Sequence, residues 1–245
     1  QRVSSREATA CGVSAIMVSA VDPKSSTEAQ NRIGAQVPLF TTDSDAPDTN
    51  RVAYIGSSNT DAGMQAGEIA KKAMPDGGTC IGFVGLLGAD NARERIDGMK
   101  AALAGSNVEL IDVRGDDIDM TRAKRNVEDA LAANPDIDCM VGFYSYNPPR
   151  IYEVLKESGK LGEITVVAFD EDPITLGGVK EGSIAGTVVQ QPYEWGYQGM
   201  KLMAAYLEGD KSMIPADALV IVPTAIIDAS NVDAFEAELK ARIGG

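Results

Sequence analysis

Short apolar runs alternate with longer segments of helical periodicity along the whole chain. The runs are rich in valine, isoleucine and aromatic residues, which favours buried strands. They cover residues 14–19, 37–42, 52–56, 80–84, 108–113, 139–143, 165–169, 185–189 and 219–223. Strands that alternate with helices build parallel sheets whose two faces are both covered. The pattern therefore predicts an α/β fold.

The segments between these runs predict the helices. They cover residues 1–10, 26–33, 60–73, 121–133 and 193–207, and further helices start at Asp90, Pro148 and Asn231. Small residues along the 60–73 helix, from Ala62 to Ala70, are expected to let it pack closely on a sheet. Because residues 1–10 have the pattern of the end of a helix, the chain is expected to begin inside its fold.

The stretch from Cys80 to Arg95 joins a strand, a glycine-rich turn and a helix. Asp90 is the predicted N-cap, because its carboxylate can accept backbone N–H groups of the first turn. Arg93 stands in that first turn, where a cation is unfavourable against the helix dipole. This placement suggests a role toward a ligand, since open parallel sheets bind ligands at the carboxyl ends of their strands.

Composition narrows the possible functions. The chain has 245 residues, of which 44% are hydrophobic, and a net charge of −14. Such an acidic protein is not expected to bind nucleic acid through phosphate contacts, and no apolar stretch has the length of a membrane span. The sequence contains no histidine, which excludes histidine metal sites and Ser-His-Asp or Cys-His catalysis. Cys80 and Cys139 lie inside predicted strands and are expected to be small buried residues.

Polar and aromatic residues gather where predicted strands end. The residues in these segments are Asp43, Arg93, Tyr144, Asn147, Asp170 and Gln190. In one parallel sheet such ends cluster at one edge, and in two facing sheets they line a shared cleft. Carboxylates accept hydrogen bonds from hydroxyl groups, arginine donates them, glutamine does both, and an aromatic ring covers an apolar sugar face. The set suits a neutral polyol better than an anion.

Other interpretations of these segments are open. From position alone, the Asp43–Asp45 tip fits an acid–base pair, a cation site, hydroxyl acceptors or a plain turn. Asp43 and Asp170 as the pair of a glycoside hydrolase are less well supported, because the sequence does not fix their separation. The glycine motif of residues 82–88 lacks the G-x-G-x-x-G spacing of a nucleotide site. The acidic run of residues 116–119 predicts a solvated loop and helix start rather than a calcium loop.

Four motifs stand out when the chain is taken together. They are Thr42-Asp43, Ala92-Arg93-Glu94-Arg95 with Gly98, Val167-Ala168-Phe169-Asp170, and Thr187-Val188-Val189-Gln190-Gln191-Pro192. With these motifs the chain resembles the ribose-type periplasmic sugar-binding proteins of ATP-driven (ABC) importers. That family is related to the ligand-binding domains of lac-repressor-type regulators, and the resemblance covers nearly the whole chain.

The resemblance implies a two-lobed type I periplasmic-binding-protein fold with parallel sheets flanked by helices and a three-stranded hinge. It places residues 1–57 and 192–219 in an N-terminal lobe and residues 58–191 and 220–245 in a C-terminal lobe, with hinge crossings near Ser57, Gln191 and Leu219. It also implies a monomer that closes on a sugar or polyol and is then bound by a membrane permease. Such a protein is periplasmic, or extracellular and tethered as a lipoprotein, and needs no cofactor, metal or catalytic residue.

Position by position, Asp43, Arg93, Asp170 and Gln190 match hydroxyl-binding positions of the family. Tyr144 falls where several members have asparagine, and Ser44 falls where ribose binders have arginine, so ribose itself is a less favoured ligand. Gln1 aligns inside the family's second helix, so the front strand–helix–strand segment is expected to be missing. The alternative function is the effector domain of a lac-repressor-type regulator, and a carbohydrate-acting enzyme is a further rival.

Overall fold

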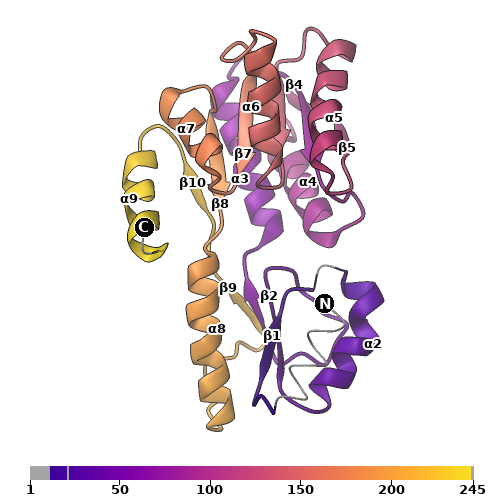
Figure 1. The fold of residues 1–245 in the computed structure, drawn as a ribbon, viewed down its shortest axis with the longest axis vertical. Coiled ribbons are helices and arrows are strands. Elements are labelled where there is room, and N and C mark those ends of the chain that lie inside the picture. The colour runs from indigo at the N-terminus through magenta and orange to yellow at the C-terminus, as the bar shows by residue number, and fades with distance from the viewer. Residues whose placement is uncertain (1–11, 21, 244–245) are drawn as a thin grey trace. The chain divides into compact units, whose positions relative to one another are not determined.

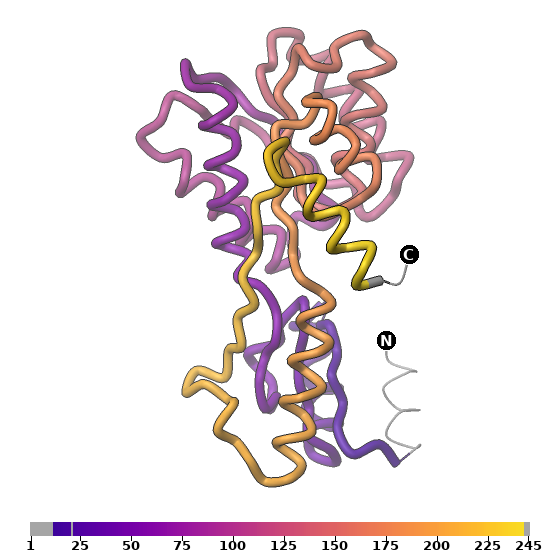
Figure 2. The backbone as a smooth tube through the Cα atoms, turned by 90° about the vertical axis from the view of Figure 1, so that its left-hand side faces the viewer, coloured from indigo at the N-terminus to yellow at the C-terminus, as the bar shows by residue number. Residues whose placement is uncertain are grey.

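The computed structural model describes residues 12–20 and 22–243. It divides the chain into two compact units, Gln1–Ser58 with Gln191–Pro223 and Asn59–Gln190 with Thr224–Gly245. The chain passes from one unit to the other after Ser58, Gln190 and Pro223. Figure 2 traces the backbone, coloured by residue number. That these passages act as a hinge stays a prediction, as do the lobe boundaries derived from the resemblance.

The first unit is built on a parallel sheet. Its strands, from edge to edge, are β1 (Ile16–Val18), β2 (Leu39–Thr42), β3 (Tyr54–Gly56) and β9 (Leu219–Ile221). Helix α2 (Pro23–Gly34) connects β1 to β2, and α8 (Pro192–Leu207) packs on β2 and β3 (Figure 1). Trp195 and Leu202 of α8 bury their side chains against Phe40 and Ile55 of the sheet.

The second unit contains the larger sheet. Its strands, in spatial order, are β10 (Ala225–Ile227), β8 (Gly186–Val189), β7 (Thr165–Phe169), β6 (Cys139–Gly142), β4 (Gly78–Val84) and β5 (Val108–Gly115). Neighbouring strands run parallel, except that β10 is antiparallel to β8. Because strands and helices alternate along the chain, each parallel connection carries a helix across a face of the sheet.

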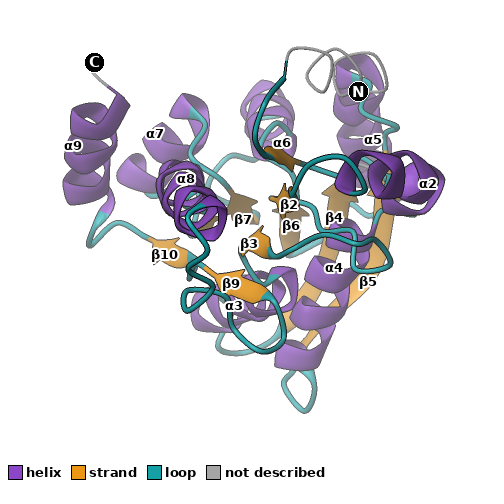
Figure 3. Cartoon of the chain, turned by 90° about the horizontal axis from the view of Figure 1, so that it is seen from below, coloured by secondary structure: helices purple, strands orange, loops and turns teal. Residues whose placement is uncertain are grey.

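Helices cover both faces of this second sheet (Figure 3). One face carries α3 (Asn59–Ala73) and α4 (Asp90–Leu103), and the other carries α5 (Met120–Ala133), α6 (Asn147–Glu157), α7 (Pro173–Glu181) and α9 (Val232–Ile243). Alternate residues of one strand serve the two layers: in β4, Cys80 and Val84 join the first core, while Ile81 and Phe83 join the second. Both sides of the sheet are therefore buried, which explains its continuous apolar runs.

The structure confirms the predicted α/β class. Cys80 and Cys139 are fully buried, as expected, and β5 is an edge strand. The predicted helix over residues 1–10 lies outside the described residues, as does Cys11. Within the described part of the chain, no helix combines the length and apolar character needed to cross a membrane.

Two elements were not predicted from the sequence. Strand β10 follows β9 directly, because Pro223 ends the apolar run predicted as one strand and the chain resumes at Ala225. Helix α7 contains Gly177 and Gly178, which weaken its helical signal. It is nonetheless started by Asp172, whose carboxylate accepts the backbone N–H of Ile174 at 2.8 Å.

Helices α3 and α4 approach each other at their backbones. A Cβ atom on Gly63 would lie 2.0 Å from the carbonyl oxygen of Arg95, and one on Gly98 would lie 2.1 Å from that of Thr60. Ala62, by contrast, lies in the core between α3 and the sheet. The expected close packing of small residues on a sheet is thus wrong for Gly63, which faces α4.

Substitution of Gly98 by alanine tests this helix contact. Gly98→Ala should destabilise the second unit by about 2 kcal/mol, because the new methyl group meets a backbone carbonyl that cannot rotate away. The matched control is Gly177→Ala in α7, where no atom lies within 4 Å of the new Cβ. There the substitution should stabilise the fold by up to about 1 kcal/mol. Urea unfolding of both variants measures the difference, and equal effects would contradict the close contact.

Candidate functional site

The carboxyl ends of β4, β6, β7 and β8 lie along one edge of the second sheet, because these strands are parallel neighbours. Four predicted site residues follow these ends: Arg93 on α4, Tyr144 after β6, Asp170 after β7 and Gln190 after β8. The topology therefore brings residues from distant parts of the sequence to one edge. We call this edge, with those four residues, the strand-tip site.

Asp170 and Gln190 are in direct contact. The Gln190 Nε2 group donates a hydrogen bond of 3.1 Å to Asp170 Oδ1. Asp170 has a left-handed backbone with φ of 66°. Its carbonyl oxygen accepts a bond of 2.7 Å from the buried Thr187 hydroxyl, and its N–H bonds Val188 O at 2.9 Å. The backbone that carries the carboxylate is thus fixed from both sides.

Arg93 is exposed at the start of α4. Its guanidinium forms an ion pair with Asp90 and donates a hydrogen bond of 3.0 Å to Gly88 O. The predicted N-cap role of Asp90 is wrong: the N-cap is Ala89, and Asp90 lies inside the first turn. There the carboxylate is favourable to the helix dipole and offsets the unfavourable cation beside it.

Arg95 is a buried residue beside the strand-tip site that the sequence analysis did not single out. It is only 3% exposed. Its Nε donates to Asn59 Oδ1 at 3.0 Å, its Nη1 donates to Phe143 O at 2.7 Å, and its guanidinium lies 5.9 Å from the ring centre of Tyr144. The signal was present in the helical period, because Arg95 shares the inner face of α4 with Ala92 and Met99.

Tyr144 connects the tip of β6 to α4. Its hydroxyl donates a hydrogen bond of 3.0 Å to Asn91 Oδ1. Its ring packs edge-to-face with that of Tyr146, at 6.3 Å between centres. Gly85 makes room for both rings, since a Cβ there would lie 2.6 Å from the Tyr144 ring and 2.7 Å from the Tyr146 hydroxyl.

Asn147 is buried behind Tyr144 and engages neighbours at both ends of its amide. Its Oδ1 accepts the backbone N–H of Tyr144 at 3.2 Å, and its Nδ2 donates to Asp116 Oδ2 at 2.8 Å. A direct role of Asn147 in ligand binding stays a prediction. The solvated loop expected for residues 116–119 is wrong at Asp116, which is only 1% exposed. The expected solvated helix start is confirmed at Asp119, which is exposed and caps α5.

The glycine motif of residues 82–88 serves packing. A Cβ on Gly82 would lie 2.7 Å from the ring of Phe143, and Gly85 accommodates the two tyrosines. At Gly88 the space is open. Two of the three glycines are thus explained by aromatic neighbours, and none of these contacts requires a phosphate group.

Asp43 belongs to the first unit, where it follows β2 in a left-handed conformation with φ of 62°. Its carboxylate accepts a hydrogen bond of 2.8 Å from Ser19, which follows the neighbouring β1. Asp45 pairs with the largely buried Arg51 at 2.6 Å. Of the interpretations left open for this tip, Asp45 therefore fits a structural role. In the described part of the chain, no group of three or more acidic, cysteine or histidine side chains could hold a metal ion.

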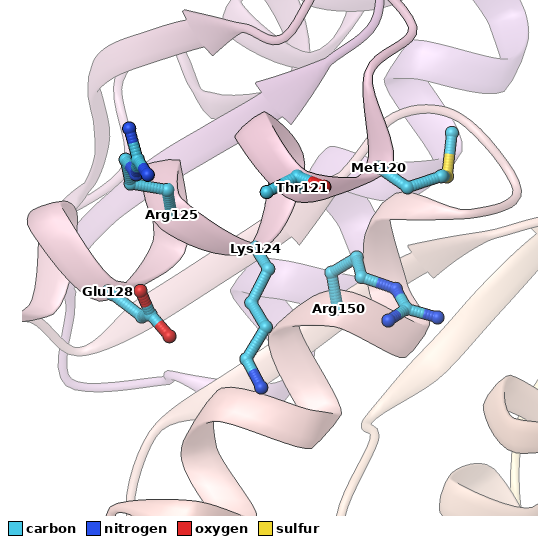
Figure 4. Close-up of a pocket in the computed structure, with 6 residues that line it drawn as sticks. All are labelled: Met120, Thr121, Lys124, Arg125, Glu128 and Arg150. Atoms are coloured by element: carbon cyan, nitrogen blue, oxygen red, sulfur yellow. The ribbon is translucent and has the colours of Figure 1, made fainter.

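A shallow cavity of about 330 Å³ lies elsewhere on the second unit, between α5 and α6 (Figure 4). Its cations include Lys124 and Arg150. Lys124 contacts Glu153 and Glu157 at 3.0 Å each, and Arg150 contacts Glu153 at 2.7 Å. The cavity shares no residue with the strand-tip site, and Lys124 and Arg150 are already paired with acids.

Comparison with known proteins places the chain in a family. Residues 3–211 match a model described as a periplasmic binding protein domain. The chain belongs to this family. It is 28% identical over 190 residues to the ribose import binding protein of Salmonella typhimurium, covering 77% of this chain and 64% of that protein. It is 24% identical over 240 residues to the xylose/arabinose-binding protein of Sulfolobus acidocaldarius, covering 91% and 59%. The chain therefore spans less than two thirds of either relative.

Solved structures of periplasmic binding proteins share the fold. An ABC transporter solute-binding protein of Burkholderia graminis, in complex with D-arabinose, is 29% identical with a TM-score of 0.87. The glucose-galactose binding protein GanP of Geobacillus stearothermophilus is 25% identical with the same TM-score of 0.87. Each match covers 94% of this chain and 81% of the other. The predicted family and type I fold class are confirmed.

Glu171, beside Asp170, makes the stability of the fold depend on pH. Burial, followed by the charge of Asp170, raises the pKa of Glu171 above its ordinary value of 4.5. The folded state then binds this proton more tightly than the unfolded chain, so the contribution to stability is complete below pH 4.5 and is lost as pH rises through the raised pKa. Glu171→Gln should therefore raise the urea midpoint relative to the wild type at pH 7 but not at pH 4.

The exposed Glu163 provides the control for this experiment. Glu163→Gln removes the same charge from the loop that precedes β7 and should leave the urea midpoint unchanged at both pH values. A Glu171→Gln variant that is less stable than the wild type at pH 7 would contradict this account, in which burial and the charge of Asp170 both disfavour the ionised form of Glu171.

Proposed function

We propose that this periplasmic binding protein is the solute-binding component of an ATP-driven sugar importer, and that its two lobes close on a small neutral sugar or polyol. One observation carries the proposal: a chain of this family has Tyr144, Asp170 and Gln190 at the tips of three neighbouring parallel strands, and Arg93 in the helix that follows the fourth. The relatives named above are a ribose import binding protein and a xylose/arabinose-binding protein, and one solved neighbour is in complex with D-arabinose.

The chemistry of the strand tips supports a neutral polyol. Asp170 supplies a carboxylate that accepts from sugar hydroxyl groups, and Gln190 offers both a donor and an acceptor. The charge of Arg93 is offset by Asp90. Asp170 and Glu171 add two negative charges, against the one positive charge of the buried Arg95 beside Tyr144. The remaining negative charge disfavours an anionic ligand. The ring of Tyr144 provides an apolar surface for the C–H face of a sugar.

Asp43 of the first unit is proposed as a further hydroxyl acceptor. Its carboxylate is held by Ser19, so it keeps a defined orientation at the end of β2. Like Asp170, it occupies a left-handed backbone position directly after a strand. Strained backbone positions of this kind are concentrated at functional sites. They persist only where the surrounding structure holds them in place.

The same proposal covers location and partners. We infer a periplasmic or extracellular protein that delivers its sugar to the membrane permease of an importer, and that binds without catalysing a reaction. The net charge of −14 makes the effector domain of a DNA-binding regulator the less favoured alternative. A basic helix-turn-helix upstream in the gene would favour that alternative.

Thermal shift with sugars tests the proposal. A panel of pentoses, hexoses, polyols and one nucleoside should include a ligand that raises the melting temperature by several degrees when present at about 100 times its Kd. Arg93→Ala and Asp170→Ala should each abolish that shift, because each removes a hydroxyl partner at the strand-tip site. Arg122→Ala is the matched control, since Arg122 also stands in the first turn of a helix and pairs with an aspartate, Asp117.

The control variant should keep the full ligand-induced shift. A wild-type-like shift in both Arg93→Ala and Asp170→Ala would reject the assigned site. No shift of the wild-type protein with any member of the panel would reject the sugar-binding function.

A further inference from the structure

A buried carboxylate lies behind the tip of β6, outside the set of proposed ligand-binding residues. Asp116 directly follows the edge strand β5 and is 1% exposed. Its Oδ1 accepts hydrogen bonds from the Tyr146 hydroxyl at 2.6 Å and the Ile118 N–H at 2.9 Å. Its Oδ2 accepts from Asn147 Nδ2 at 2.8 Å. Three donors therefore surround one acid that has no cationic partner among these contacts.

The loop that delivers this carboxylate is strained. Asp117 and Ile118 both have left-handed backbones, with φ of 56° and 62°. For a β-branched residue such as Ile118 this conformation is a true outlier. The carboxylate of Asp116 helps to hold it by accepting the Ile118 N–H. Local strain persists only where the surrounding structure fixes it, and it is concentrated at functional sites.

Two routes lead from Asp116 to Tyr144. In the first, Asp116 orients the Asn147 amide, whose oxygen accepts the Tyr144 N–H at 3.2 Å. In the second, Asp116 holds the Tyr146 hydroxyl, and the Tyr146 ring packs edge-to-face on that of Tyr144. Burial and the hydrogen bond to Asp116 also raise the pKa of Tyr146, which keeps its hydroxyl a donor. Both the backbone and the ring of Tyr144 thus depend on one acid.

We propose that Asp116 is a positioning residue that fixes the Tyr144 ring at the strand-tip site and thereby sets which sugars fit. The proposal rests on the function proposed above, because it gives Tyr144 the role of a wall against the ligand. Asp116 itself touches no ligand in this account. Its effect passes through Asn147 and Tyr146.

The donor and acceptor pattern makes the proposal testable by exchange. In Asp116→Asn, the new amide nitrogen faces another donor in either orientation of the side chain. In place of Oδ1 it opposes the Ile118 N–H, and the strained loop loses its hydrogen bond. In place of Oδ2 it opposes the Nδ2 group of Asn147, which must then turn its amide over, so that the Tyr144 N–H loses its acceptor. Combining Asp116→Asn with Asn147→Asp reverses the two roles and restores every hydrogen bond. The relocated acid would stand in the first turn of α6, where the helix dipole favours it.

Sugar affinity by calorimetry is the first measurement, made with the panel member that gives the largest thermal shift. Asp116→Asn should weaken binding at least about tenfold, and the exchanged double variant should bind at least about threefold more tightly than Asp116→Asn alone. Asp117→Asn is the control: it removes a charge from the same loop at an exposed position, and asparagine tolerates its left-handed backbone. It should bind like the wild type.

A double-mutant cycle separates positioning from simple stability. In a Tyr144→Ala background, Asp116→Asn should no longer change the affinity or the ranking of two sugars, while it should still lower the urea midpoint. If the losses of affinity caused by Asp116→Asn and by Tyr144→Ala simply added when the two substitutions are combined, the proposal would be overturned. So would a wild-type affinity and sugar ranking in Asp116→Asn alone.

A ligand-free readout keeps this test separate from the sugar-binding proposal. In protein labelled with 3-fluorotyrosine, the fluorine signal of Tyr144, assigned by its loss in Tyr144→Phe, should shift or broaden in Asp116→Asn and return in the exchanged double variant. An unchanged signal would reject the positioning role even if sugars bind. A changed signal in a protein that binds no sugar would leave the positioning role intact and reject only the proposed function.

Discussion

The parallel pairing of β4, β6, β7 and β8 is the constraint on which the rest of the second unit depends. Because all four strands run the same way, their carboxyl ends lie at one edge, and the residues that follow them become neighbours. The helices then bury both faces of the sheet and leave that edge as the place where polar side chains gather. A ligand site at this edge follows from topology before any individual side chain is considered.

Close packing fixes the individual tips. Gly85 admits two tyrosine rings beside the end of β4, and Arg95 bonds the carbonyl oxygen of Phe143 from inside α4. Asp170 is held through its own backbone by Thr187. Buried polar groups are normally paired by hydrogen bonds. These contacts provide that pairing and hold the backbone next to the strand ends in place. The site residues thus stand directly beside helices and strands, where these contacts fix their backbones.

The strands and their polar tips could be predicted because their signals are local. Apolar runs, glycines and aspartates mark where a strand ends, wherever the strand lies in the fold. Tertiary partners could not be predicted in the same way. Asp116 and Asp117 are neighbours in one acidic run, yet only Asp116 is buried, because Tyr146 and Asn147 reach it from a distant segment. Arg93 and Arg95 differ in the same way: Arg93 is exposed and Arg95 is buried. Residues two positions apart on a helix face nearly opposite sides.

A crystal structure of the protein with the sugar that stabilises it most would test the central claim directly. We expect the sugar at the strand-tip site, with hydroxyl oxygens about 3 Å from the Asp170 carboxylate and the Gln190 amide, and with a C–H face against the Tyr144 ring. A sugar bound on another surface, with these side chains unchanged and uncontacted, would contradict the account.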